Sequence, residues 1–273
     1  METSLARAEI YLQGAQVTAY AHQAGAPLLF VSQASRFEAG VPIRGGVPLV
    51  FPWFGRKADD AEAPQHGPAR SLPWRLEEAT TTATDVVELT FALTEVSVAR
   101  WPDGAALRYR VGIGAALALT LEVENRGRAP FRFEEALHTY LAVDDVEHIH
   151  VTGLEGATYL DETQGFARQR DAAGPLVVRG ETDRVYDDTR ATCVVWDPGA
   201  HRRVEISKTE SAATIVWNPG AARARALPDL GDEEWRQFVC VESGNVGRGA
   251  VTVAPGARHC LAIRIQSEPW NSG

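Results

Sequence analysis

Residues 117–127 read LALTLEVENRG, and this stretch is the clearest indication of fold in the 273-residue chain. Leucine or valine occupies every second position from Leu117 to Val123, and smaller or polar residues lie between them. A period of two is typical of a strand with one buried and one solvated face, and the following Asn-Arg-Gly is a turn sequence. The stretch therefore predicts an antiparallel β-strand that ends in a turn.

Similar runs recur along the chain and indicate an all-β fold. They are short and bounded by Gly, Pro, Asp or Asn, at the spacing of sandwiches or barrels rather than of βαβ units. Helical patterns are confined to residues 221–227 and 228–238, and neither is long enough to cover a parallel sheet. We expect one large antiparallel β-sandwich that forms a single domain over residues 1–273. The strand-like runs lie at residues 87–94, 191–196, 202–208, 213–217, 250–255 and 260–266.

The composition is that of a chain that needs no disulfide bonds. With 273 residues, 45% of them hydrophobic, it can bury roughly three quarters of its unfolded surface. Its three cysteines are an odd set without CxxC spacing, which favours a reducing compartment. Residues 1–16 are too polar for a signal peptide, and the most apolar run, residues 46–55, is short and contains two prolines. We expect a soluble, cytoplasmic protein.

The charge of the chain limits its partners. A formal net charge of −9 and a pI near 5.3 argue against nucleic acid and anionic membranes, because both require a broad basic surface. No GxSxG, Walker A or dinucleotide-binding fingerprint occurs, which argues against a serine hydrolase, an NTPase and a dehydrogenase. We expect a monomer with a small-molecule partner, and an anionic ligand would have to be bound by a few arginines within motifs.

Two strand-like segments carry an acid and a base of the kind that opens a sugar ring. In FRFEEALHTYLAV, residues 131–143, the period of two places Glu134 and His138 on one face and apolar side chains on the other. In FVCVESGN, residues 238–245, Glu242 is the only acidic residue. The alternative is that His138 is a core histidine whose ring nitrogens are satisfied, which is the more common role of a lone histidine.

Residues 40–74 are rich in Gly and Pro and predict a long, loop-rich segment between strands. Arg44 lies in IRGG, where the glycines allow the backbone to approach a ligand, and Arg70 lies in QHGPAR with Gln65 and His66. A guanidinium group binds phosphate oxygens in a bidentate manner. The alternative is two solvent-exposed arginines beside a loop histidine without a chemical role.

Two other groups are open to more than one interpretation. Asp183 in ETDRVYDD suits a carboxylate that accepts hydrogen bonds from sugar hydroxyls, or else an aspartate in a turn. His148 and His150 share a strand face and could bind a metal. Because no third ligand lies at a fixed spacing, we predict no metal there.

Six motifs occur together in an order that resembles a known family. The chain resembles the glucose-6-phosphate 1-epimerases, the hexose-6-phosphate mutarotase branch of the aldose 1-epimerase superfamily, from about residue 10 to about residue 268. The resemblance implies a galactose-mutarotase-like β-sandwich with a sugar site on the concave face of one sheet. The motifs are RGGVPLVFPWFG, QHGPAR, ALHTYLAV, ETDRVY, VWNPG and FVCVES.

The resemblance also implies roles for individual residues. His138 and Glu242 match the catalytic histidine and glutamate of the family. The chain departs from the family pattern at Gly220, where a bulky aromatic is expected, and at Arg223, where lysine is usual. No metal or organic cofactor is implied. The positions matching substrate contacts are Arg44, Gln65, Arg70 and Asp183, with His66 beside them.

These residues suggest a mechanism for interconverting sugar anomers. As a hypothesis, Glu242 takes the proton of the C1 hydroxyl and His138, held protonated by a nearby carboxylate, protonates the ring oxygen. Arg44 and Arg70 would hold the 6-phosphate. Two alternatives stay open: a glycoside hydrolase that pairs Glu242 with Asp183 or Glu134, and a non-catalytic carbohydrate-binding or regulatory module.

Overall fold

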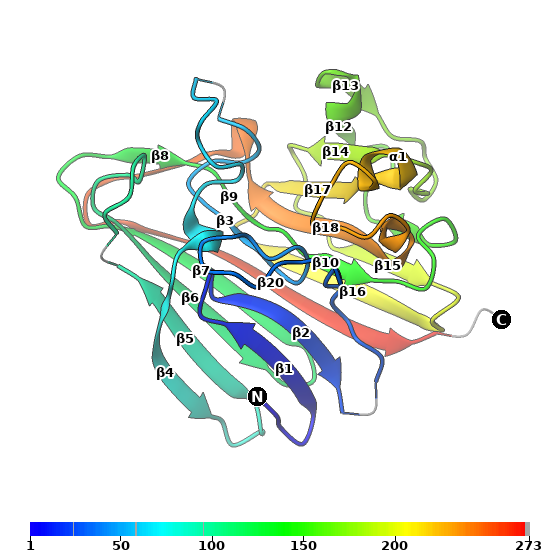
Figure 1. The fold of residues 1–273 in the computed structure, drawn as a ribbon, viewed down its shortest axis with the longest axis horizontal. Coiled ribbons are helices and arrows are strands. Elements are labelled where there is room, and N and C mark those ends of the chain that lie inside the picture. The colour runs from blue at the N-terminus through cyan, green and yellow to red at the C-terminus, as the bar shows by residue number, and fades with distance from the viewer. Residues whose placement is uncertain (24, 58, 95, 271–273) are drawn as a thin grey trace.

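The computed structural model describes residues 1–23, 25–57, 59–94 and 96–270, and its regular structure is mainly antiparallel β-strand (Figure 1). Within these residues, the predicted all-β antiparallel sandwich is confirmed by two eight-stranded sheets. The first, here called the front sheet, has the strand order β13-β12-β14-β17-β18-β9-β3, and β10 also pairs with β18. Its strands are β3 (Leu49–Val50), β9 (Glu135–Leu137), β10 (Tyr140–Ala142), β12 (Thr158–Asp161), β13 (Ala167–Arg170), β14 (Thr182–Tyr186), β17 (Ala213–Asn218) and β18 (Phe238–Asn245).

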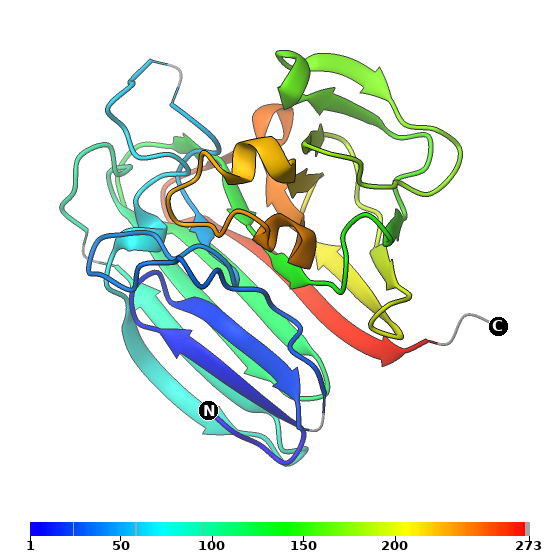
Figure 2. The ribbon, with the colours of Figure 1, turned by 45° about the vertical axis from the view of Figure 1, so that its right-hand side comes forward.

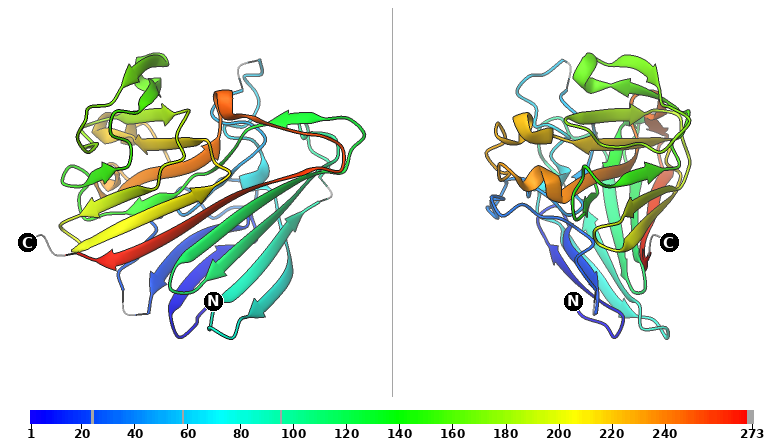
Figure 3. Two further views of the ribbon diagram at one scale, coloured as in Figure 1. Left: turned by 180° about the vertical axis from the view of Figure 1, so that it is seen from behind. Right: turned by 90° about the vertical axis from the view of Figure 1, so that its right-hand side faces the viewer.

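The second sheet, here called the back sheet, has the order β11-β15-β16-β20-β7-β6-β5-β4. The long strand β20, red in Figure 3, runs along the middle of this sheet. The strands are β4 (Arg75–Thr81), β5 (Val87–Leu93), β6 (Ala105–Ile113), β7 (Leu117–Asn125), β11 (His150–Thr152), β15 (Cys193–Asp197), β16 (Arg202–Thr209) and β20 (Arg258–Pro269).

Smaller elements complete the fold. The 3₁₀ helix η3 and the short helix α1 lie over the front sheet beside β17 and β18 (Figure 2). The predicted helix over 228–238 is reduced to the single 3₁₀ turn η3, and the one predicted over 221–227 is the five-residue α1. These elements are β1 (Ala6–Tyr11) paired with β2 (Gln16–His22), β8 (Phe131–Phe133) paired with β19 (Val251–Val253), α1 (Gly220–Ala224), η1 (Ala69–Ser71), η2 (Glu162–Gln164), η3 (Glu234–Gln237) and η4 (Gly247–Gly249).

The core lies between the sheets and follows the alternation seen in the sequence. Leu117, Leu119, Leu121 and Val123 of β7 are fully buried, as the period of two predicts. β18 is buried along its whole length, because one of its faces packs on the core and the other is covered by loops. Burial on both faces explains why FVCVESGN reads as an almost continuous apolar run up to Glu242.

The predicted strand over 131–143 is correct in its faces and wrong in its continuity. Residues 131–133 pair with β19 in a separate small sheet, and at Glu134 the backbone N–H turns to donate to the Pro52 carbonyl oxygen at 3.0 Å. After Glu134 the chain joins the front sheet. At His138 the N–H donates to the Pro48 carbonyl oxygen at 3.0 Å, in the same antiparallel register as the β3–β9 pairs, and the regular pairing ends there because proline has no N–H to return a bond.

A search of the described part of the chain for membrane-crossing helices found none that is long and apolar enough.

Candidate active site

The register of the front sheet gathers polar side chains on one of its faces. Asp183 lies opposite Trp217, and Ile215, two residues before Trp217, lies opposite Glu242. Residues that are opposite one another, or two apart on one strand, share a face, so these side chains point the same way. The run from β9 to β10 keeps one register along β18, which places His138 opposite Glu242.

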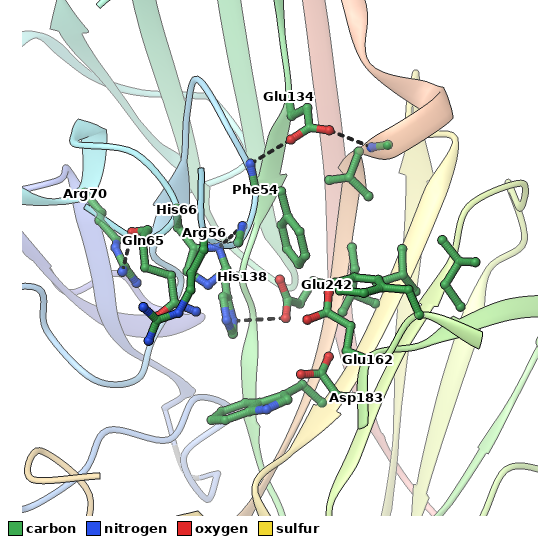
Figure 4. Close-up of a pocket in the computed structure, with 18 of the residues that line it drawn as sticks. Phe54, Arg56, Gln65, His66, Arg70, Glu134, His138, Glu162, Asp183 and Glu242 are labelled. Atoms are coloured by element: carbon green, nitrogen blue, oxygen red, sulfur yellow. Dashed lines mark hydrogen bonds and ion pairs between the residues drawn. The ribbon is translucent and has the colours of Figure 1, made fainter. Parts of the chain in front are cut away.

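These side chains form the floor of a pocket of about 580 Å³, a volume suited to a small molecule (Figure 4). Its walls come from the loop-rich segment before η1, from the junction of β12 and η2, from α1 and from the turn after β18. The structure brings together every site residue that the sequence singled out, since all seven line the pocket: Arg44, Gln65, His66, Arg70, His138, Asp183 and Glu242.

His138 and Glu242 form a buried pair in this pocket. His138 Nδ1 lies 3.3 Å from Glu242 Oε1, and the two side chains are 7% and 1% exposed. The approach is not aligned as a hydrogen bond, and His138 Nδ1 and Glu242 Oε2 have no hydrogen-bond partner among the described residues. The Tyr140 ring stacks on the imidazole at 4.8 Å between centroids and holds it in place. The predicted acid and base are therefore in contact with one another.

Burial determines how this pair is protonated. It raises the pKa of Glu242 well above its usual range, and nearby carboxyl groups raise it further. Burial also lowers the pKa of His138 well below its usual range, with Arg70 and Arg44 as additional causes. The expectation that a carboxylate holds His138 protonated is thus wrong for the free protein, because the loss of hydration outweighs one neighbouring charge. Both shifts favour the uncharged forms of the two groups in the free protein.

Two more carboxyl groups, Asp183 on β14 and Glu162 at the start of η2, form what is here called the acidic end of the pocket (Figure 4). Burial, followed by the charge of Glu162, raises the pKa of Asp183 to about 8. Burial also raises the pKa of Glu162, and Arg223 opposes this shift. Glu162 was not predicted as a site residue, because DETQG after a strand indicates a turn and nothing local indicates a pocket.

Asp183→Asn is expected to stabilise the fold at alkaline pH. Because the folded-state pKa of Asp183 is raised, this carboxyl group contributes to the free energy of unfolding in its protonated form. The contribution is fully present below the unfolded pKa of roughly 3.9 and is lost as pH rises through about 8. The variant should match the parent protein near pH 4 and exceed its free energy of unfolding by about 1–3 kcal/mol at pH 8–9. Urea unfolding curves across this pH range measure the difference.

The control for this prediction is Glu181→Gln, which alters a carboxylate near the same pocket that is 40% exposed. Because Glu181 is one of the charges that raise the pKa of Asp183, its removal should reduce the loss of stability at alkaline pH by less than Asp183→Asn does. Parallel curves for the parent protein and Asp183→Asn would show that Asp183 titrates normally in the folded state.

Basic side chains gather at the other side of the His138–Glu242 pair (Figure 4). Arg44 donates to Tyr140 Oη at 3.1 Å and pairs with Asp229 at 3.0 Å, so its guanidinium group is largely engaged. Arg70 donates a single hydrogen bond, of 2.7 Å, to the Gln65 carbonyl oxygen, and burial lowers its pKa to about 10. Arg70 therefore keeps more donors for an anion. This group, here called the cationic end, consists of Arg44, Arg56 and Arg70.

His66 lies between the cationic end and the buried pair. The His66 backbone is left-handed, with φ of +65°. At the next residue, Gly67, a Cβ would lie 2.0 Å from the Phe51 carbonyl oxygen, so the turn requires glycine at position 67. The turn presents the His66 ring edge-on to His138, at 5.4 Å between centroids. The Gly55 N–H donates to His66 Nδ1 at 3.1 Å, and burial lowers the pKa of the ring. His66 is thus neutral, with a proton on Nε2 available to donate.

Gly220 explains the departure from the family pattern at one wall. Its φ is +61°, and a Cβ would lie 2.6 Å from the Glu181 backbone nitrogen, so the backbone here accepts only glycine. The helix that follows carries Arg223 to the pocket, where its Nε lies 3.6 Å from Glu181. Arg223 and Leu227 both line the pocket at this wall.

His138, Cys240 and Glu242 each offer one atom that could bind a metal, all within 4.8 Å of one another. Burial, followed by Glu242, raises the pKa of the Cys240 thiol well above its usual range, whereas a metal ligand must be a thiolate. The expectation of a site without metal stays a prediction. At the other candidate position, the His148 side chain is 77% exposed and its Nδ1 lies 3.3 Å from an Asp145 carboxylate oxygen.

Three comparisons place the chain among known proteins. The family model described as Aldose 1-epimerase matches residues 1–266. A protein of Cenchrus ciliaris named "Putative glucose-6-phosphate 1-epimerase" is 32% identical over 96% of this chain and 82% of its own length, and one of the same name from Salmonella typhimurium is 33% identical over 87% and 79%.

The structural matches agree with the sequence matches. The crystal structure of "a putative mutarotase (YeaD)" from Salmonella typhimurium has a TM-score of 0.91 and 29% identity, over 98% of this chain and 89% of that one. A galactose mutarotase-like protein of Lactobacillus casei, at 16% identity and a TM-score of 0.75, shares the fold. These matches confirm the predicted galactose-mutarotase-like sandwich and the predicted isomerase class, a mutarotase. The chain belongs to the aldose 1-epimerase family.

Proposed function

We propose that the protein interconverts the α and β anomers of a hexose 6-phosphate, with glucose 6-phosphate as the first candidate, by acid–base opening and closure of the sugar ring. The observation that carries this proposal is the buried His138–Glu242 pair, in contact at 3.3 Å between the cationic end and the acidic end of one pocket. The relatives named as glucose-6-phosphate 1-epimerases support a phosphorylated substrate.

The two ends of the pocket orient the substrate. In a hexopyranose, C1 is bonded to the ring oxygen on one side and to C2 on the other, and C6 is attached to C5, the far neighbour of the ring oxygen. With C1 at Glu242 and the ring oxygen at His138, the 6-phosphate falls at the cationic end. The C2 hydroxyl then falls at the acidic end, where Asp183 and Glu162 can bind it.

Anomer exchange requires one proton to pass from the C1 hydroxyl to the ring oxygen and back. The mechanism requires His138 protonated and Glu242 ionised in the complex, and a phosphate dianion at the cationic end favours this by offsetting the charges of Arg70 and Arg44, which add to burial in lowering the pKa of His138. Glu242 then accepts the C1 hydroxyl proton, the bond from C1 to the ring oxygen breaks, and His138 protonates that oxygen. After rotation about the C1–C2 bond, the reverse transfers close the ring.

The parent protein is expected to exchange the anomers of glucose 6-phosphate with a kcat/KM about 10–100-fold above that for glucose, the value of one or two charge-assisted hydrogen bonds. Saturation-transfer NMR on both sugars measures this ratio, with a chelator-treated sample to test for metal. Equal values for the two sugars would contradict phosphate recognition, and no exchange of either would contradict the mutarotase proposal.

Among the alternatives, a hydrolase that uses Glu134 is disfavoured. Both Glu134 carboxylate oxygens accept hydrogen bonds from backbone N–H groups, those of Phe54 and Gly247.

A one-domain, monomeric enzyme of the cytoplasm remains part of the proposal. It is supported by the absence of disulfides among Cys193, Cys240 and Cys260 and by the acidic net charge.

A further inference from the structure

Glu134 links two segments that line the pocket from different parts of the chain. Its Oε2 accepts the Phe54 N–H at 2.9 Å and its Oε1 accepts the Gly247 N–H at 2.8 Å. Its own N–H donates to the Pro52 carbonyl oxygen at 3.0 Å. Figure 4 shows the Glu134 carboxylate between the two N–H groups, at the edge of the pocket. One side chain therefore anchors both the loop that carries the cationic end and the turn that follows β18.

The loop held by Glu134 reaches the buried pair through His66. The Phe54 ring meets the His66 ring edge-on at 5.0 Å between centroids, and the next N–H, that of Gly55, sets the His66 tautomer. His66 in turn packs against His138 at 5.4 Å. By holding the Phe54 N–H, Glu134 helps to place the adjoining Gly55 N–H, whose bond to Nδ1 leaves the His66 proton on Nε2 toward the ligand.

The turn held by Glu134 forms the opposite wall. Val246 packs with Val185 and Ile215 beside the acidic end, and Phe54 packs against the same cluster. Gly247 has φ of +56°, and its carbonyl oxygen accepts a hydrogen bond of 2.9 Å from Arg132. The turn at Gly247 is therefore bonded to two side chains, Glu134 and Arg132. The Phe54 N–H is bonded to Glu134.

We propose that Glu134 is a positioning residue for the mutarotase reaction: by binding the Phe54 and Gly247 N–H groups together, it sets the distance between the two walls and the His66 tautomer that meets the sugar. This inference rests on the proposed function. It assigns Glu134 no proton transfer, since its oxygens are engaged by the backbone.

The test compares Glu134→Ala, Glu134→Gln and Arg132→Ala with the parent protein. Glu134→Ala loses two hydrogen bonds to a charged acceptor, and its kcat/KM for glucose 6-phosphate should fall about 10–100-fold. Glu134→Gln keeps one acceptor oxygen and should lie between. Arg132→Ala loosens the same turn without touching Phe54, and should stay within about twofold.

A spectroscopic readout separates positioning from general destabilisation. In ¹⁵N-histidine NMR, His66 of the parent protein and of Arg132→Ala should show a proton on Nε2 alone, and Glu134→Ala should show both tautomers. If Glu134→Ala does not fold, Glu134→Gln gives the answer by the same two readouts. A folded variant with parental kcat/KM and an unchanged His66 tautomer would overturn the inference. If the parent protein lacks mutarotase activity, the proposed function fails, and the tautomer measurement still decides whether Glu134 sets His66.

Discussion

Glu242→Gln lowers kcat for anomer exchange on glucose 6-phosphate by about 10²–10⁴-fold, and His138→Asn lowers it by a similar factor. Each substitution removes one of the two proton-transfer partners while nearly preserving its volume in a pocket where both side chains are buried. Because each ring opening or closure needs both a proton acceptor and a proton donor, losing either member stops the exchange. The double variant should therefore lose little more than the worse single variant, far less than the product of the two effects.

Saturation-transfer NMR on an equilibrium mixture of anomers measures these rates, and melting curves show whether each variant is folded. Glu181→Gln is the matched control, because it changes a carboxylate near the pocket that does not line it. A folded Glu242→Gln variant with near-parental kcat would remove Glu242 from the mechanism. Additive losses in the double variant would mean that the two groups act in separate steps.

Arg70→Ala is expected to lower kcat/KM for glucose 6-phosphate by about 10–100-fold and to change that for glucose much less. Of the two arginines predicted to bind phosphate, Arg70 has the more available guanidinium group. Arg44 is already bound to Asp229 and Tyr140, whereas Arg70 donates one hydrogen bond, to a carbonyl oxygen. Burial strengthens its attraction for a dianion.

Arg70→Lys serves as the matched control, since it keeps the charge and loses the planar pair of donors. It should retain part of the preference for the phosphorylated sugar. The quantity to follow is the ratio of kcat/KM for the two sugars. A similar loss for both sugars would place Arg70 at the sugar ring or in the fold instead of at the phosphate.

Local patterns predicted the strands and their faces well. The alternation from Leu117 to Val123 appears unchanged as the buried face of β7. The same period placed Glu134 and His138 on one face, and both line the pocket. These predictions succeed because side-chain direction along a strand depends on the backbone of neighbouring residues alone.

The predictions that failed depended on distant parts of the chain. The strand over 131–143 is divided because residues 131–133 pair with β19, whereas the next residues pair with the segment from Pro48 to Pro52, more than eighty residues earlier, whose prolines end the regular pairing. Glu162 was missed because its place in the pocket depends on how η2 folds over β14. The protonation of His138 was predicted in the wrong direction because a neighbouring carboxylate can be inferred from motifs, whereas the extent of burial cannot.

The sequence by itself determined the all-β class, the faces of the strands and, through ordered motifs, the membership of the family and a set of seven residues that prove to share one pocket. Only the tertiary structure decided that His138 and Glu242 lie 3.3 Å apart, that burial raises the pKa of Glu242, and that Glu134 joins two walls. The physical reason is one of range. A strand period is written into adjacent residues, whereas desolvation and charge act between groups that only the folded chain brings together.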